Sequence, residues 1–143
     1  MTEETRRLLR ALPTLSGDAP VFDTSALPNN PVGLFLEWLD VARRAQVCEP
    51  HAMTLSTVDE NGLPDSRVLV LKDVDERGWA FASTASSAKG EQLASNPQAA
   101  LTFWWQPLVR SVRVRGRVIP ASREECLADL RARSLAAQSG VDP

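Results

Sequence analysis

The residues from which metal sites and catalytic triads are commonly built are scarce in this chain. Its 143 residues include one histidine, His51, and two cysteines, Cys48 and Cys126. A site with several histidine ligands is therefore excluded, and the distant cysteines match no metal-binding spacing, so no bound metal is expected. We interpret the cysteines as free thiols, which are typical of a reducing cytosol.

Long apolar runs are also missing. None approaches the roughly 18 residues that cross a membrane, and no apolar stretch follows the charged N-terminal residues, as it would in a secretory signal. The net charge is −2 and the isoelectric point is about 5.4. The chain as a whole therefore has no basic field that would attract nucleic acid. Its length and composition predict one globular domain in the cytoplasm.

Several common functional motifs are absent as well. The chain has no G-x-G-x-x-G, no G-x-x-x-x-G-K-[ST] and no H-E-x-x-H, which excludes the usual dinucleotide fingerprint, the Walker P-loop and a helical zinc site. No G-x-S-x-G elbow accompanies His51, so a hydrolase triad is not expected. We interpret His51 as a residue at the start of a strand, without a catalytic role.

Residues 1–30 are expected to form an arm, and residues 31–143 a single domain. Four prolines or glycines between 13 and 28 interrupt any regular element of the arm, which either moves freely or lies across a neighbour. Asn30 and Pro31 are typical of a helix start. Apolar residues at three- and four-residue spacing then continue the helix to Glu49-Pro50.

The period of the pattern then changes to that of strands. Strands are expected at 52–58, 67–72, 79–84, 99–105 and 109–119, with a short helix at 86–93 and a capping box at Ser122 that opens a last helix. Within the segment 67–72, consecutive residues are apolar, so both faces of the strand carry apolar side chains. This pattern predicts burial on both faces. Strands joined by short turns favour an antiparallel sheet. We therefore predict a mainly β protein with flanking helices, a small closed or split β-barrel.

Lysine is used unevenly, since Lys72 and Lys89 are the only two. Lys89 lies in the first turn of the short helix, where backbone N–H groups and hydroxyls favour a phosphate. Arg67 and Lys72 bound the apolar strand, and Ser83 ends the next one. These residues together could clamp a phosphorylated ligand. On spacing alone, a solvated lysine and ordinary helix caps are the more common explanation of such a pattern. Arg67 and Lys72 are five positions apart, so a bulge is needed to bring both to one ligand.

The last strand offers an alternative. Arg113, Arg115 and Arg117 share one face, which is typical either of a solvated strand face or of a nucleic-acid stripe with tryptophan platforms. Of the pair Trp104-Trp105, one side chain must face the core and the other must face outward. The outward one is expected to cover a subunit interface or a flat aromatic ligand.

Several segments, in this order, closely resemble the pyridoxamine 5′-phosphate oxidase family. They are RVLVLKDVDERG at 67–78, Phe81, SAKG at 87–90, Asn96-Pro97, FWW at 103–105 and VRVRGRV at 112–118. The helix at 31–39 and EPHAMTLSTV at 49–58 are similar too. The resemblance runs without gaps over about residues 30–120.

The resemblance implies a Greek-key split barrel that binds FMN at a homodimer interface. In that family, pyridoxamine or pyridoxine 5′-phosphate is oxidised to pyridoxal 5′-phosphate. A hydride passes from C4′ of the substrate to N5 of the flavin, and O₂ reoxidises the flavin to give H₂O₂. The chain is therefore expected to be an FMN-dependent oxidase with a small phosphorylated substrate and no nucleic-acid or membrane partner.

The resemblance also assigns roles to residues of this chain. Arg67 and Lys89 would bind the FMN phosphate, with a hydroxyl from Ser83, and the backbone at Leu69 and Val70 would follow the flavin ring. Lys72 and Arg133 are the catalytic candidates at the substrate phosphate. The expected cofactor-binding residues are Arg67, Val68, Leu69, Val70, Lys72, Ala82, Ser83, Lys89 and Ser111.

The chain departs from the family pattern at several of these positions. Ala82-Ser83 replaces Tyr-Thr, Ala88 replaces a phosphate-binding Arg, and Ser111 replaces a Gln that reaches the flavin of the partner chain. In the family, a Tyr, an Arg and a Ser bind the phosphate of the substrate. The matching positions in this chain are Asp129, Arg133 and Ala137, so only the Arg is kept. Family members continue beyond the position of Pro143, so the chain is expected to be a fragment or a short homologue.

These departures leave alternatives open. One keeps the barrel with a different substrate or without oxidase activity, as a flavin-binding module. Another replaces FMN by a deazaflavin or a haem.

Overall fold

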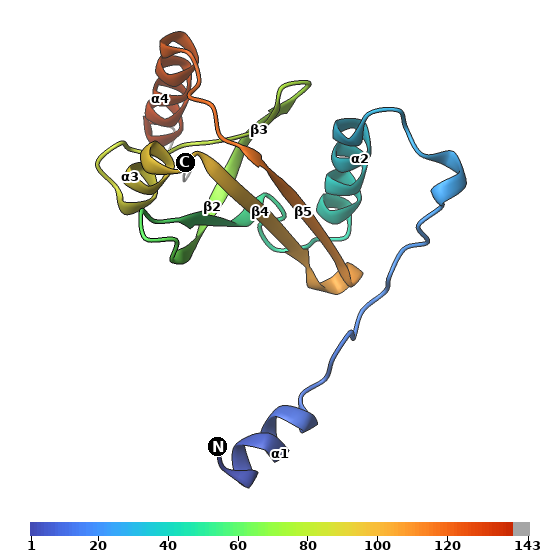
Figure 1. The fold of residues 1–143 in the computed structure, drawn as a ribbon. Coiled ribbons are helices and arrows are strands. Elements are labelled where there is room, and N and C mark those ends of the chain that lie inside the picture. The colour runs from blue at the N-terminus through green and yellow to red at the C-terminus, as the bar shows by residue number, and fades with distance from the viewer. Residues whose placement is uncertain (139–143) are drawn as a thin grey trace.

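The computed structural model describes residues 1–138, with side chains as far as Arg133. From α2 onward the helices and strands follow one another in the order expected from the sequence, and one helix of the arm precedes them (Figure 1). The elements are α1 (Glu3–Ala11), the 3₁₀ turn η1 (Thr24–Ala26), α2 (Pro31–Arg44), β1 (Ala52–Val58), β2 (Pro64–Asp75), β3 (Gly78–Phe81), α3 (Ala88–Ser95), β4 (Gln98–Trp105), the 3₁₀ turn η2 (Gln106–Leu108), β5 (Arg110–Arg117) and α4 (Arg123–Gln138).

The five strands form one antiparallel sheet in the order β3-β2-β1-β4-β5. The curled sheet has α2 near the β4–β5 hairpin, and α3 and α4 at the opposite end (Figure 1). Its architecture is the predicted one, a split-barrel half with flanking helices. β1 is central, with Leu55 opposite Arg67 of β2 and Leu101 of β4.

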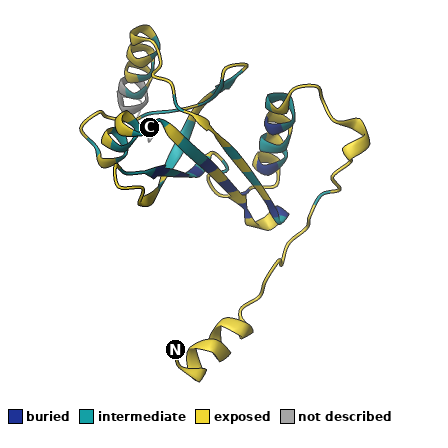
Figure 2. Cartoon of the chain, viewed as in Figure 1, coloured by how far each residue is buried: buried dark blue, intermediate teal, exposed yellow. Residues whose placement is uncertain are grey.

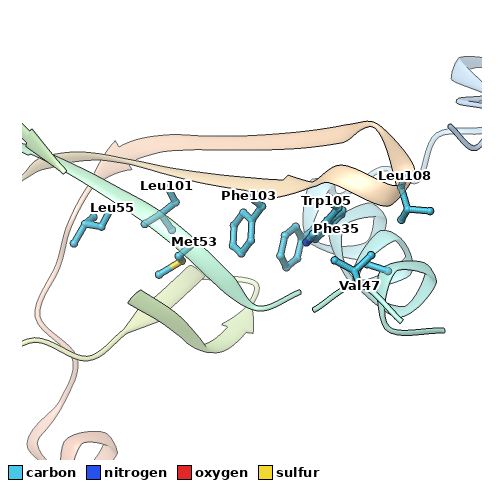
Figure 3. Close-up of a cluster of buried hydrophobic side chains, with 9 residues drawn as sticks. Phe35, Val47, Met53, Leu55, Leu101, Phe103, Trp105 and Leu108 are labelled. Atoms are coloured by element: carbon cyan, nitrogen blue, oxygen red, sulfur yellow. The ribbon is translucent and has the colours of Figure 1, made fainter. Parts of the chain in front are cut away.

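The core lies between α2 and the inner face of β1 and β4. Figure 3 shows its side chains in a row from Leu55 at one end to Leu108 at the other. Phe35 of α2 contacts both Phe103 and Trp105 through tilted ring pairs. The buried apolar residues are Phe35, Ala42, Val47, Met53, Leu55, Leu101, Phe103, Trp105 and Leu108.

The local signals that predicted these elements are confirmed in atomic detail. The side chain of Asn30 accepts a hydrogen bond from the Val32 N–H and caps α2, whose first residue is Pro31. Along β1, Met53, Leu55 and Thr57 are buried while their neighbours are not. Asp59 accepts hydrogen bonds from two backbone N–H groups of the next turn.

The two adjacent tryptophans face opposite sides of the sheet, as expected. Trp105 is 1% exposed and donates its indole N–H to the Pro50 carbonyl, 2.8 Å away, whereas Trp104 is 53% exposed. On β5, which pairs with β4, Arg113 and Arg115 point away from the partly buried valines, as the alternation predicts. Strand alternation thus assigned the charged and apolar faces of β5, and it placed the two tryptophans on opposite faces without deciding which one is buried.

The prediction that segment 67–72 is buried on both faces is wrong for the single chain. No residue of β2 is fully buried, and Val68 is 70% exposed. The physical reason is that helix α2 covers the inner face of the sheet, while Val68 lies on the outer face in the same row as Thr54 of β1. The side chain of Val68 therefore faces solvent unless another surface covers it, while Leu69 and Leu71 pack against the core.

The β2–β3 hairpin also differs from its predicted limits. β2 continues to Asp75, and β3 ends at Phe81 instead of Thr84. Val74 pairs with Trp79 across this hairpin, which extends the ladder into the segment predicted as a turn. Gly78 has a φ of +131°, a conformation that side chains with a Cβ rarely adopt.

The arm contacts the domain at residues 16–18, beside η2, and at Phe22, whose ring packs edge-on against Trp38 of α2 with 5.0 Å between centroids. The Asp18 N–H donates to the Pro107 carbonyl at 2.9 Å, and the Gln106 amide donates to the Ser16 carbonyl at 2.7 Å. A Cβ at Gly17 would come within 2.5 Å of the Pro107 oxygen, so glycine permits this close approach. Helix α1 has no buried residue and stands apart from the sheet (Figures 1 and 2). Within residues 1–138, no helix is long and apolar enough to cross a membrane.

The central position of Phe103 in the core leads to a stability prediction. Replacing Phe103, which is 0% exposed, with Ala is expected to lower the free energy of unfolding by about 3–5 kcal/mol, because the cavity cannot close fully. Urea unfolding measures the change. Thr102→Ala, one residue away on the exposed face, is the matched control and is expected to cost less than about 1 kcal/mol. Equal losses in the two variants would contradict the assigned core.

Candidate functional site

The candidate site lies where α3 packs against β1 and β2 of the sheet. Ser87 begins α3, and its hydroxyl accepts a hydrogen bond from the Gly90 N–H at 3.1 Å. The same hydroxyl donates to the Thr84 carbonyl at 2.8 Å, which ties the helix start to the preceding loop. A helix N-terminus presents unpaired N–H groups and a partial positive charge, so an anion is favoured beside it.

Lys89 adds a full positive charge to this helix start. Its ammonium group donates to the Ser87 hydroxyl at 3.3 Å and is otherwise without an ion-pair partner among the described residues. The Lys89 side chain thus turns toward the capping residue. A phosphate beside Ser87 would meet both the lysine and the helix N-terminus.

A close backbone approach supports the same loop. A Cβ at Gly90 would collide with the Thr84 carbonyl oxygen and would lie 3.0 Å from the Ala85 Cα. Glycine at this position therefore allows the loop to fold tightly over the first turn of α3. The loop and the helix start form one compact unit whose backbone conformation depends on Gly90.

Arg67 anchors α3 to the sheet. Its guanidinium donates to the Thr57 hydroxyl at 2.6 Å, to the Gln92 side-chain oxygen at 3.1 Å and to the Leu55 carbonyl at 3.3 Å. It also pairs with the Asp65 carboxylate at 3.1 Å. Four hydrogen bonds leave little of the five-donor capacity of arginine for a ligand. In this structure Arg67 therefore positions the helix that carries Lys89.

The surroundings of Arg67 complete this network. Thr57 is buried, and its hydroxyl donates to the same Gln92 oxygen. The Ser66 N–H and the Gln92 amide hold the pKa of Asp65 below its usual range, and Arg67 lowers it further. Asp65 thus stays ionised and offsets part of the positive charge of Arg67.

Lys72 lies further along β2, at an irregularity in the strand. The register between β2 and β3 shifts between Leu71 and Asp73, which is the kind of bulge that the five-residue separation of Arg67 and Lys72 requires. The Lys72 ammonium faces α4, where it lies 4.0 Å from the Asp129 carboxylate. Lys72 therefore has a carboxylate partner before any ligand arrives.

Arg133 converges on the same carboxylate. Its Nε donates to Asp129 Oδ2 at 2.8 Å, and its Nη2 donates to the same oxygen. Lys72, Asp129 and Arg133 form a cluster, the Asp129 triad, that joins β2 to α4. The structure thus brings the two catalytic candidates together, with an acidic residue between them. Ala137, the third position of this group, lies outside the residues whose side chains are described.

Helix α4 also has stabilising contacts outside this triad. Ser122 and Glu125 exchange the two hydrogen bonds of the predicted capping box, at 3.0 and 3.2 Å. Arg77 of the β2–β3 turn also pairs with Glu125, at 2.6 Å, and with Asp75. The hydrogen bond from Arg77 is the main reason that the pKa of Glu125 lies below its ordinary value.

The remaining predicted residues divide into two groups. Ala82 and Ser83 follow β3, and the Ser83 hydroxyl reaches only the Thr84 carbonyl, at 3.4 Å. Leu69 packs against the core, while Val68 and Val70 pair with Thr54 and Ala52 of β1. Ser111 is distant from these residues in the sheet order, since it lies on β5 opposite Trp104. Within one chain the structure does not bring Ser111 to the others.

Three parts of the site were not expected from the sequence. The Thr57–Gln92 contact joins residues 35 positions apart, and neither residue type signals it. The close approach at Gly90 is hinted at only by a glycine in a helix. The pairing of Asp129 with Arg133 has a sequence signal, because oppositely charged residues four apart in a helix are neighbours. Within residues 1–138 no group of side chains forms a metal site.

A substitution at Gly90 tests the compact loop. Alanine normally stabilises a helix relative to glycine by about 1 kcal/mol, but Gly90→Ala is expected to lower the free energy of unfolding because its Cβ meets the Thr84 carbonyl. Chemical denaturation measures the sign. Gly33→Ala in α2 is the matched control, since its Cβ would meet only Pro28 at 3.9 Å, and it is expected to be stabilising. A stabilised Gly90→Ala variant would contradict the described loop.

Comparison with known proteins supports the fold and the family. The family model described as pyridoxamine 5′-phosphate oxidase matches residues 39–142. The pyridoxine/pyridoxamine 5′-phosphate oxidase of Bordetella petrii is 48% identical over 112 residues, which cover 78% of this chain and 53% of the relative. That of Hyphomonas neptunium is 46% identical over 125 residues, which cover 87% and 55%. The chain thus spans about half the length of these curated relatives.

Two solved structures share the fold. PhzG from Burkholderia lata 383, in complex with tetrahydrophenazine-1-carboxylic acid, has a TM-score of 0.72 and 29% identity, covering 76% of this chain and 55% of that one. A pyridoxamine 5′-phosphate oxidase-related, FMN-binding protein of Nostoc punctiforme has a TM-score of 0.55 and 22% identity, covering 73% and 56%. With the matching family model and the identity to curated oxidases, they lead to one assignment: the chain belongs to the pyridoxamine 5′-phosphate oxidase family.

Proposed function

We propose that this protein is an FMN-dependent oxidoreductase. The observation that carries the proposal is the start of α3, where Ser87, Lys89 and the close approach at Gly90 form a cradle suited to a phosphate. The cradle lies beside the apolar strand β2, so a phosphate and a flat ring would have adjacent surfaces. The residues present therefore fit FMN, although Ala88 supplies no charge.

Each residue has a definite task in this proposal. Lys89 would neutralise one phosphate charge, and the N–H groups of the first turn of α3 would donate hydrogen bonds. Ser83 would add a hydroxyl. Arg67 would act mainly by fixing α3 against β1 through Thr57 and Gln92, because its donors are already engaged.

The apolar part of the cofactor would lie along β2. The exposed side chain of Val68 and the backbone at Leu69 and Val70 offer a wall that excludes water on one side of a ring. When bound, FMN supplies the redox chemistry, accepting a hydride from the substrate and passing electrons to O₂. Lys72 and Arg133 would hold the acidic end of the substrate in place for that transfer.

The relatives' names make pyridoxine 5′-phosphate the first substrate to test, with pyridoxal 5′-phosphate and H₂O₂ as expected products. A second class is suggested by the carboxylic acid bound in the PhzG structure. Both classes present an acidic group to a cationic site. They differ in the charge of that group, since a phosphate monoester carries about −1.5 to −2 at neutral pH and a carboxylate −1.

We further propose that the working form is a homodimer. Val68 and Trp104 are 70% and 53% exposed on the sheet face opposite the core. A flat cofactor on this face needs a second wall to exclude water, and a second copy would supply it. Ser111, remote within one chain, would then reach the cofactor of the partner.

FMN titration tests the cradle directly. Saturable quenching of flavin fluorescence is expected for the unaltered protein. Lys89→Ala is expected to weaken FMN binding by about 10–100-fold, because a charge-assisted hydrogen bond to the phosphate is lost. Arg7→Ala removes the same charge from the exposed helix α1 and is expected to leave the affinity unchanged. Absence of quenching in the unaltered protein would refute the proposed cofactor.

Sedimentation velocity of the FMN-saturated protein at micromolar concentration tests the dimer. The unaltered chain is expected to sediment as a dimer and Val68→Glu as a monomer, since a charge would be buried in the interface. Val21→Glu places the same charge on the 91% exposed arm and is expected to remain dimeric. A dimeric Val68→Glu variant would place the interface elsewhere.

A further inference from the structure

The Asp129 triad has an unusual balance of charge for a site that would receive a phosphate. Lys72 and Arg133 contribute two positive charges, and Asp129 contributes one negative charge, so the sum is +1. All three side chains are partly exposed, Lys72 at 27% and Asp129 at 29%, so a ligand in solution has access to them. A dianionic group would therefore face one net positive charge together with a resident carboxylate.

Arg133 and Lys72 differ in how many of their hydrogen-bond donors are already used by Asp129. Arg133 uses one edge of its guanidinium, Nε and Nη2, on Asp129 Oδ2. Lys72, in contrast, is 4.0 Å from Asp129 Oδ1, a distance beyond a direct hydrogen bond, so its N–H groups stay available. The free capacity of the triad is thus one ammonium group and the second edge of one guanidinium.

A purely structural role for Asp129 explains only half of this arrangement. An Asp and an Arg four apart on a helix commonly pair on its surface. The second cation, however, comes from the bulge in β2 and turns toward the same carboxylate. The Arg77–Glu125 pair also ties α4 to the β2–β3 turn, so Asp129 is not the sole link between this helix and the sheet.

We infer that Asp129 sets the substrate class of this site. It restricts binding to a compound with a singly charged acidic group, such as an aromatic carboxylate, and disfavours a phosphate monoester. The inference rests on the proposed function, because it takes Lys72 and Arg133 as the residues that receive the substrate. Asp129 leaves the triad with one net positive charge, which balances a monoanion. The desolvation cost of an anion rises with the square of its charge, whereas the attraction to the triad rises only in proportion to it, so a dianion gains too little to offset its lost hydration.

Isothermal titration calorimetry with two probes that share one ring tests the inference. The probes are 1-naphthoate and 1-naphthyl phosphate, and they are titrated at pH 8 into the FMN-saturated full chain. The unaltered protein is expected to bind the carboxylate more tightly. Asp129→Asn is expected to bind the phosphate about tenfold more tightly and the carboxylate about threefold more tightly, which shifts the preference toward phosphate.

Two further variants separate charge from fold. Glu124→Gln makes the same charge change on the exposed first turn of α4, away from the triad, and is expected to keep the preference of the unaltered protein. Asp129→Glu retains the charge and is expected to keep the preference for carboxylate. Circular dichroism shows whether each variant is folded. If Asp129→Asn is unfolded, the comparison of the two probes in the unaltered protein and in Asp129→Glu decides the outcome.

Several results would overturn the inference. They are tighter binding of the phosphate than of the carboxylate by the unaltered protein, an unchanged preference in folded Asp129→Asn, and no binding of the carboxylate at all. The same titrations on protein without FMN keep the test separate from the cofactor. A protein that binds no FMN but still prefers the carboxylate through Asp129 would refute the proposed function and leave the substrate class standing.

Discussion

The hydrogen-bond network around Arg67 is the constraint on which the candidate site depends. One guanidinium joins a buried hydroxyl of β1, a carboxylate at the start of β2 and an amide of α3. A buried polar cluster is favourable only when its groups are satisfied together, so the three elements are fixed as a unit. The start of α3, with Lys89 and the Gly90 loop, takes its position from this unit. The proposed phosphate cradle would thus be a consequence of how the sheet holds its helix.

Strand β2 links the two ends of the proposed site. Arg67 begins its apolar run, and Lys72 follows at the bulge, where the register against β3 shifts. A regular strand would direct these two side chains to opposite faces. The irregularity allows one strand to serve the helix α3 at one end and the helix α4 at the other. Its exposed valine between them leaves an apolar surface, which a cofactor and a second chain would cover together.

The sequence predicted most of the architecture, because its signals are local. The cap at Asn30, the alternation along 52–58, the paired tryptophans and the capping box at Ser122 each depend on residues close in the chain. The burial of 67–72 was predicted wrongly, since an apolar strand face indicates a need for cover without saying which molecule supplies it. The Thr57–Gln92 contact and the turn of Lys72 toward Asp129 depend on tertiary placement, which no local pattern encodes.

The α3 end and the α4 end of the candidate site differ in how many of the anion-binding residues expected from the family resemblance they keep. At α3 the lysine, the cap and the glycine are retained, and the loss of a basic side chain at Ala88 removes one contact without adding an opposing charge. At α4 an acidic residue stands between the two cations. Removing a donor weakens binding to every anion, whereas inserting a carboxylate discriminates among anions by their charge. Under the proposed function, Asp129 would therefore change which acidic group the site accepts, while the proposed cradle for the cofactor phosphate would remain.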